Sequence, residues 1–270
     1  MSQKTLSRSN VFVIALILVA ATSLVLAGIN KARGSHLRQK CRMNLNLCFN
    51  ELAWCFQDSR YAGFPEGTYP NEGLSPERRL SWFVTSLAYL RAGEKGSVAI
   101  PNWFKAWDSD ENRRIAALVV NELHCPAQPE PGDSAAEAFG LTHYVGIAGI
   151  GERAAELQQS DSNAGVFGYE RQTKLTDIKD GTANTMFLVE TGNRHGPWGA
   201  GGFPTVRGLK STGQAYIGLN CQFGGLHNGG CMALFADGAI HFLKDSISPA
   251  VFEAFSTIAG NEAVTPPSDD

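Results

Sequence analysis

The residues best suited to chemistry lie near the C-terminal end of the chain, between Gly224 and Leu243. This stretch holds His227 and, after nine intervening residues, Asp237 and Gly238. An imidazole and a carboxylate can share a hydrogen bond, bind a cation or carry out acid–base chemistry. In the competing structural interpretation, Asp237 forms a turn and His227 fixes the loop before it. The sequence leaves both interpretations open, and we expect the structural one.

A second set of oxygen-bearing side chains surrounds a glycine-containing turn, and it consists of Asp180, Asn184 and Glu190. Calcium takes about six to eight oxygen ligands from carboxylates, amides and main-chain carbonyls. These residues are therefore candidate calcium ligands, although the run Asp180-Gly181-Thr182 matches a calcium loop only loosely. The competing interpretation is a turn followed by the cap of a helix or strand.

The sequence gives little support to an enzyme. It has no G-x-S-x-G run of the kind that presents a nucleophilic serine. Cys125 with His124 or His143 is a conceivable nucleophile and base, but a Cys-Pro pair after a buried helix is more typical of structure. We therefore expect a protein with no catalytic residues.

A binding module is the stronger alternative to a purely structural role. Aromatic side chains able to stack on a sugar or peptide occur on glycine-rich or irregular stretches, at Trp103, Trp107, Trp198 and Phe203. The bound molecule would be calcium, a glycan or a peptide. Charge is low and nearly balanced, with 23 basic and 26 acidic residues, so a nucleic-acid surface is not expected.

The six cysteines contain no C-x-x-C pair, which argues against a zinc site of the common kind. Cys41, Cys48 and Cys55 repeat every seven residues. On a helix such residues lie about 10 Å apart along the axis, too far to bridge one another. We expect them to form a buried apolar stripe. Alternatively, one of them forms a disulfide bridge with Cys125. A bridge between Cys221 and Cys231 also remains open.

The clearest segment is N-terminal. Residues 11–29 form an uncharged apolar run, and a helix of roughly 20 apolar residues spans a bilayer. The run is either an uncleaved signal anchor or a signal peptide cut after Ala27. It is longer than the usual apolar region of a signal peptide, so we predict a transmembrane anchor at 11–29, preceded by a cytoplasmic segment at 1–10.

Residues 30–58 continue the helix as a stalk. Apolar residues recur at steps of three and four, close to a heptad stripe, at Leu37, Cys41, Leu45, Cys48, Leu52 and Cys55. Because no proline interrupts this part of the chain, anchor and stalk can form one helix roughly 70 Å long. We expect its stripe to pack on the chain's own sheet rather than on a neighbouring subunit.

Residues 59–262 are expected to form an α+β domain. Helices are predicted at Ser81–Leu90 and Asp108–Leu123, and the later chain is dominated by short strands such as Leu141–Gly149, Met186–Glu190 and Ala215–Leu219. Asp237 and Gly238 between two apolar runs predict a hairpin. Ser248 and Pro249 then start a short helix that ends before Gly260. Residues 263–270 are expected to be a disordered tail.

Taken together, these segments resemble a bacterial pilin-like family of unknown function, domain of unknown function 1559, which is named for a C-terminal His-x9-Asp-Gly motif. The blocks that carry the resemblance run in order over most of the chain: Cys41–Leu45, Phe64–Gly67, Trp107–Asn112, Cys125–Pro126, Asp177–Glu190, His227–Gly238 and Phe242–Pro249.

The resemblance implies the architecture of type II secretion pseudopilins and type IV pilins. In these proteins a membrane helix continues into a stalk, and an antiparallel sheet packs on the stalk. The resemblance also favours a globular domain outside an inner, cytoplasmic membrane. The basic residues that follow the span oppose this orientation by the positive-inside rule: Lys31, Arg33, Arg38, Lys40 and Arg42. The chain departs from pilins because it lacks the processing glycine and the glutamate of the apolar run, which favours a single anchored subunit.

The sequence therefore predicts an α+β protein with a long N-terminal anchor and stalk, an antiparallel pilin-like sheet and a short C-terminal helix. Its predicted role is structural or assembly-related, in the cell envelope or in secretion. Its expected partners are the membrane, through residues 11–29, and pilin-like or envelope proteins.

Overall fold

The structure is a computed structural model that describes residues 8–57, 63–91, 100–128, 139–193, 195–210, 213–262 and 264–266. Within these ranges, the side chains of residues 53–55, 57 and 87–91 are outside the description. The predicted tail at 263–270 and the first seven residues of the predicted cytoplasmic segment therefore lie largely or wholly outside the described residues, as does the side chain of Cys55.

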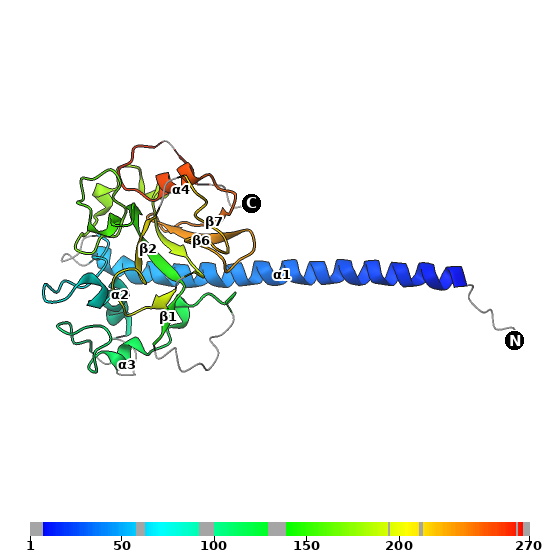
Figure 1. Cartoon of the computed structure of the whole chain (residues 1–270), viewed down its shortest axis with the longest axis horizontal. Coiled ribbons are helices and arrows are strands. Elements are labelled where there is room, and N and C mark those ends of the chain that lie inside the picture. The colour runs from blue at the N-terminus through cyan, green and yellow to red at the C-terminus, as the bar shows by residue number, and fades with distance from the viewer. Residues whose placement is uncertain are drawn as a thin grey trace.

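One helix, α1 (Arg8–Gln57), runs through both the predicted anchor and the predicted stalk. The described residues after α1 form a globular part, which we call the head. Figure 1 shows the first half of α1 projecting away from the head, while its second half runs into the head. The large apolar side chains from Val11 to Ile29 are 45–74% exposed. This part of α1 is long and apolar enough to cross a membrane once.

The second half of α1 presents a buried stripe to the head, formed by Cys41, Leu45, Cys48 and Leu52. These side chains share one core cluster with Met232 and Leu234 of the sheet. The stripe therefore packs on the chain's own sheet, as its spacing predicts. Burial of apolar surface at about 25 cal/mol per Å² is the main force that holds the helix there.

Within the described residues, a five-stranded sheet has the order β5-β2-β3-β6-β7. Its strands are β2 (Tyr144–Ile150), β3 (Met186–Glu190), β5 (Val206–Leu209), β6 (Gly230–Phe235) and β7 (Ile240–Lys244). The neighbouring strands are antiparallel except that β2 and β5 pair in parallel. β1 (Leu141–Thr142) and β4 (Gly196–Pro197) form a separate antiparallel pair. The α+β class is confirmed, with a sheet that is mixed at one edge.

Side chains alternate between the two faces of this sheet, as the pleat requires. On β6, Met232 and Leu234 face the cluster that contains the α1 stripe. Cys231, Ala233 and Phe235 face a second cluster that contains Phe252 and Phe255 of α4 (Pro249–Phe255). The sheet is therefore covered by α1 on one face and by α4 on the other.

The C-terminal hairpin and helix form as the sequence predicts. Asp237 Oδ1 accepts a 2.9 Å hydrogen bond from the Ala239 N–H, and Gly238 adopts φ 91°. Ser248 Oγ accepts from the Val251 N–H at 3.3 Å, at the start of α4. However, α4 ends at Phe255, earlier than the sequence suggests.

Some expected elements are shorter or absent. The helix α2 (Trp82–Arg91) matches the prediction, but the helix expected at Asp108–Leu123 is reduced to α3 (Arg113–Ala116) and a 3-10 turn at Asn121–Leu123. The buried Asn112 amide donates to the main-chain carbonyls of Asn102 and Ala106. These bonds stabilise an irregular loop where the helix was expected. Similarly, the predicted strand at Ala215–Leu219 is a single bridge from Ile217 to Phe223.

Further 3-10 turns connect these elements, at Pro76–Arg78, Ala154–Glu156, Leu175–Asp177 and Thr182–Asn184.

Candidate functional site

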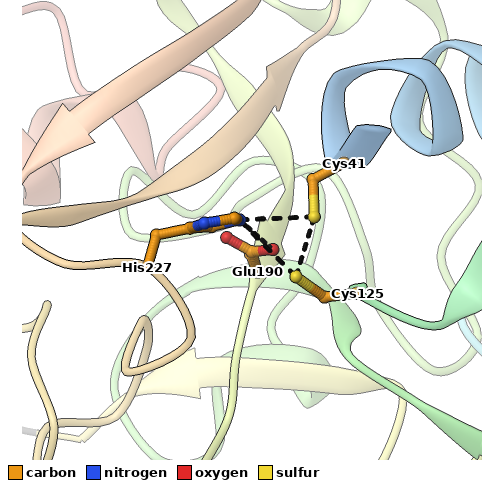
Figure 2. Close-up of side chains that lie close together, drawn as sticks. All are labelled: Cys41, Cys125, Glu190 and His227. Carbon is orange, nitrogen blue, oxygen red and sulfur yellow. Dashed lines mark hydrogen bonds and ion pairs between the residues drawn. The ribbon is translucent and has the colours of Figure 1, made fainter. Parts of the chain in front are cut away.

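Four buried side chains with metal-ligating atoms meet beside α1, and we call them the Cys41 cluster: Cys41, Cys125, Glu190 and His227. Their ligand atoms all lie within 4.8 Å of one another. Figure 2 shows the four side chains pointing toward a common centre from different parts of the fold. Cys41 comes from α1, Cys125 follows the Asn121–Leu123 turn, Glu190 ends β3 and His227 precedes β6.

The imidazole of His227 contacts all three other members of the cluster. Its Nε2 lies 3.3 Å from Cys41 Sγ, 3.5 Å from Cys125 Sγ and 3.3 Å from Glu190 Oε1. The two sulfur atoms are 2.7 Å apart. That separation is longer than the roughly 2.05 Å of a disulfide bond, so the cysteines are thiols in this structure.

The local hydrogen bonds explain why the two cysteines meet. One turn along α1 from Cys41, the Asn44 amide donates to the main-chain carbonyl of His124 at 2.9 Å. The Cys125 N–H in turn donates to Nδ1 of His143 at 3.0 Å. The segment before Cys125 is thereby held between α1 and the start of the sheet.

The glutamate and histidine are positioned by strand pairing. The Gly224 N–H donates to the Glu190 carbonyl at 2.9 Å, which lays the loop that carries His227 along the end of β3. Glu190 Oε2 accepts from the Met232 N–H of β6 at 3.2 Å. A bridge between His227 and Gly230 closes the loop before β6 begins.

Burial makes the electrostatics of the cluster unusual. Glu190 is fully buried, and its Oε1 accepts no hydrogen bond. Burial by itself lowers the pKa of His227, but the adjacent Cys41 thiol and the charge of the Glu190 carboxylate outweigh it and raise that pKa to about 9. Hydrogen bonding from Cys125 lowers the pKa of the Cys41 thiol, whereas the same bond and burial raise the pKa of Cys125.

A row of three imidazoles lies behind Cys125. The ring of His143 lies 4.4 Å from that of His124 and 5.0 Å from that of His195, between ring centres. Burial and these two neighbours lower the pKa of His143 to about 3. Because His143 Nδ1 accepts from the Cys125 main chain, the neutral ring carries its proton on Nε2. His143 therefore supports the backbone of Cys125.

The two residues of the predicted His-x9-Asp-Gly pair are not brought together. His227 precedes β6 and belongs to the Cys41 cluster, whereas Asp237 follows β6 in the exposed hairpin turn. The strand between them spans roughly 17 Å at about 3.3 Å per residue. Asp237 therefore acts in the turn, and the partners of His227 come from elsewhere in the chain.

The candidate calcium ligands are also separated. Asp180 accepts hydrogen bonds from the main-chain N–H groups of Gly260 and Asn261, at 2.8 Å each. The Asn184 amide donates to the Asp180 carbonyl at 2.9 Å. Glu190 lies at the far end of β3, in the Cys41 cluster. In this structure Asp180 holds the C-terminal segment.

Of the aromatic candidates, three take part in packing. Trp103 packs against Tyr69 with ring centres 4.5 Å apart. Trp107 Nε1 donates to the Glu77 carbonyl, and the buried Trp198 donates to that of Leu118. The fourth candidate, Phe203, lines a surface cavity of about 470 Å³.

That cavity is lined by several amide side chains and by two cationic side chains. The guanidinium of Arg207 and the ammonium of Lys210 both approach the Phe203 ring, at 4.4 and 5.7 Å. The other lining residues are Asn193, Gln214, Ala215, Tyr216, Asn220, Cys221 and Gln222.

Sequence reasoning did not identify the Cys41 cluster. The absence of a C-x-x-C pair argued against a zinc site, but these four ligands come from four distant segments. One signal was available, since Cys41, Cys125, Glu190 and His227 each fall in a separate block of the family resemblance described above.

A family model described as "Protein of unknown function (DUF1559)" matches residues 38–214. The matched residues include Cys41, Cys125 and Glu190 and end before His227. No curated protein and no solved structure gives a significant match.

Proposed function

Starting from the membership of this chain in the DUF1559 family, we propose that it is a non-catalytic, membrane-anchored pilin-like protein with its head outside the cytoplasmic membrane. Its role would be structural or assembly-related, in the cell envelope or in secretion. The observation that carries the proposal is the division of α1 into two halves. The first half is apolar and exposed, and the second half is built into the core of the head.

The packing of α1 supports a pilin-like arrangement. The helix lies along one face of the sheet through its buried stripe, and the closing hairpin reaches it as well. At the hairpin tip, a Cβ built on Gly238 would lie 2.7 Å from the ring of Phe49. The head therefore packs directly on the helix that would enter the membrane.

The arrangement of the thiols supports a non-catalytic role. A nucleophilic cysteine requires a lowered pKa and access to substrate. The pKa of Cys125 is raised by its bond to Cys41 and by burial. The pKa of Cys41 is lowered, but both side chains are fully buried, so neither thiol is open to a substrate. His143 contacts the main chain of Cys125, so it is not arranged as a base for that thiol.

Two features of the chain favour opposite orientations of the head. Basic residues lie on α1 between the apolar run and the head, and one of them, Arg38, stacks over the Phe242 ring at 5.1 Å. The positive-inside rule applied to this region favours a cytoplasmic head. The pilin-like plan favours the opposite side, and we adopt it here.

Site-directed labelling tests this orientation. A cysteine placed at Leu219, which is 73% exposed on the head, is introduced with Cys221→Ser. Spheroplasts are then treated with a membrane-impermeant maleimide. We expect labelling in intact spheroplasts at the level reached after lysis. Labelling that requires lysis, with a cytoplasmic marker equally protected, would place the head in the cytoplasm. Cys221→Ser alone is the control, since the other cysteines with described side chains are buried.

The Phe203 cavity supports a second candidate function, an anchored binding module. Its amides and its aromatic ring suit a glycan or a peptide, while the arrangement at Asp180 gives calcium weaker support. Titration calorimetry of the detergent-solubilised chain with oligosaccharides, peptides and calcium would test it. Heat that is lost on Phe203→Ala, but kept on Phe104→Ala at an 82% exposed site elsewhere, would support this candidate.

A further inference from the structure

We propose that the Cys41 cluster binds one Zn²⁺ ion, which joins α1 to the head. The site would be closed, with all four positions of the metal taken by the protein. This inference goes beyond an anchoring role and holds whichever side of the membrane the head occupies.

The donor atoms suit a transition metal. Two sulfurs, one imidazole nitrogen and one carboxylate oxygen converge, a set that favours zinc over the oxygen-seeking calcium and magnesium. In structural sites zinc is almost always tetrahedral with four protein ligands. Two thiolates supply the soft ligands that hold such an ion tightly.

The three distances from His227 Nε2 fit three of the six edges of a zinc tetrahedron. With Zn–S near 2.3 Å and Zn–N or Zn–O near 2.0–2.1 Å, ligand atoms lie about 3.3–3.6 Å apart when one is N or O. Nε2 of His227 lies 3.3, 3.5 and 3.3 Å from its three neighbours. The sulfur pair, 2.7 Å apart, has to open by about 1 Å to reach the S–S edge of a zinc tetrahedron.

The buried carboxylate is the second, independent observation. Oε1 of Glu190 is buried, accepts no hydrogen bond and faces His227 Nε2 at 3.3 Å. A buried carboxylate is costly unless a cation compensates it. His227 faces it as the charged partner in the metal-free site, and a metal ion would take over that role. A disulfide between the cysteines would leave this oxygen as it is, whereas a metal ion would coordinate it.

Binding of the ion displaces protons. Each thiol releases its proton and His227 Nε2 releases the proton that faces Glu190, so two thiolates and one carboxylate carry three negative charges against two on Zn²⁺. The remaining negative charge has a neighbour able to stabilise it. The buried Tyr144 hydroxyl lies beside Cys41. We expect this hydroxyl to donate to a metal-bound thiolate.

The ligands explain what the ion would do. Cys41 comes from α1, and the other three come from the head, so one ion would tie the helix to three parts of the domain. Because such a site does not exist in the unfolded chain, binding of the ion favours the folded state.

The test uses the full chain, purified in detergent under reducing conditions with no added metal. We expect elemental analysis to find one zinc per chain, and Co²⁺ substitution to give the intense visible bands of a tetrahedral thiolate site. Cys125→Ser and His227→Ala should each weaken zinc binding more than about tenfold in a chelator competition. Cys48→Ser, at a buried cysteine on the same face of α1, should bind zinc like the parent chain.

A ligand exchange separates coordination from a packing role. His227→Cys should keep tetrahedral cobalt binding and strengthen the sulfur-to-cobalt absorption by roughly half, since three thiolates replace two. A residue needed only for packing would give no such spectral change. This variant also keeps the proposal testable if His227→Ala fails to fold.

Two results would overturn the proposal. One is a Cys41–Cys125 disulfide in the isolated protein, found by peptide mapping without reduction, together with no zinc or cobalt binding after reduction. The other is a folded, reduced chain with free thiols that takes up no metal at micromolar concentrations.

Discussion

The side-chain amide of Asn44 on α1 donates a 2.9 Å hydrogen bond to the main-chain carbonyl of His124, 80 residues further along the chain. The same amide reaches the Asn121 carbonyl at 3.4 Å. These contacts fix both the rotation of α1 and the path of the segment that ends in Cys125. As a result, Cys41 and Cys125 face each other, and a helix surface becomes part of a site.

Removing this amide should loosen the helix from the head. We expect Asn44→Ala to lower the free energy of unfolding by about 1–3 kcal/mol, because the partly buried carbonyl of His124 loses its donor. Urea unfolding of the detergent-solubilised chain measures the change. Asn46→Ala, at an exposed position on the same helix, is the matched control and should change it by less than about 0.5 kcal/mol. Equal effects of the two variants would contradict the role assigned to Asn44.

The tip of the hairpin should tolerate no side chain at Gly238. Its φ of 91° is unfavourable for other residues, and an added Cβ would lie 2.7 Å from Phe49 Cε1. Gly213 has a similar φ of 77° with open space around it, so Gly213→Ala measures the backbone strain alone. We expect Gly238→Ala to cost about 1–3 kcal/mol more than Gly213→Ala. Thermal unfolding of both variants measures the two losses of stability. Equal losses would show that the hairpin tip is not packed tightly against α1.

The two named residues of the His-x9-Asp-Gly motif should act independently. His227→Ala removes one member of a buried charged pair and should cost about 3 kcal/mol. Asp237→Ala removes one exposed turn hydrogen bond and should cost under about 1 kcal/mol. Since the residues lie at opposite ends of β6, the double variant should be additive within about 0.5 kcal/mol. A larger coupling energy in this double-mutant cycle would argue for a direct functional pair.

Membrane insertion of the exposed first half of α1 should depend on the apolar character of this segment. Leu18→Arg places a charge near the middle of the apolar run, at a cost of about 2.5–3.5 kcal/mol for insertion. We expect a clear fall in the fraction of chain that resists carbonate extraction from membranes. Met43→Arg introduces the same charge on the same helix, at a 64% exposed position beside the head, and should extract like the parent chain. Unchanged extraction of Leu18→Arg would argue against a membrane span.

The half-buried Glu66 should make stability depend on pH. Burial and the charge of Glu170 raise its pKa, although Arg79 opposes them. The folded state therefore binds this proton more tightly than the unfolded chain does. The free energy of unfolding then falls as pH rises from the unfolded pKa of about 4.3 through the raised folded value. We expect Glu66→Gln to be more stable than the parent at pH 7 and similar to it below about pH 4. A parent that is equally stable or more stable at pH 7 would contradict this.

Local patterns in the sequence were sufficient for the elements that depend on near neighbours. The spacing of the α1 stripe predicts a helix that packs on its own sheet, and Cys41, Leu45, Cys48 and Leu52 are buried there. The Asp237-Gly238 turn and the Ser248 cap also form as predicted, because each is stabilised within a few residues of sequence. The prediction of a helix from Asp108 was wrong because Asn112 bonds to the carbonyls of Asn102 and Ala106, 10 and 6 residues earlier, which helical spacing does not reveal.

The sequence by itself determined the apolar run, the continuous helix, the α+β class and the resemblance to a family. The tertiary structure decided which chemical groups meet. It separated His227 from Asp237 and Asp180 from Glu190, and it joined His227 and Glu190 to Cys41 and Cys125. The physical reason is that turns, caps and helix faces arise from contacts close in sequence. A buried site is assembled instead by the packing of α1 on the sheet, which brings together residues far apart in the chain.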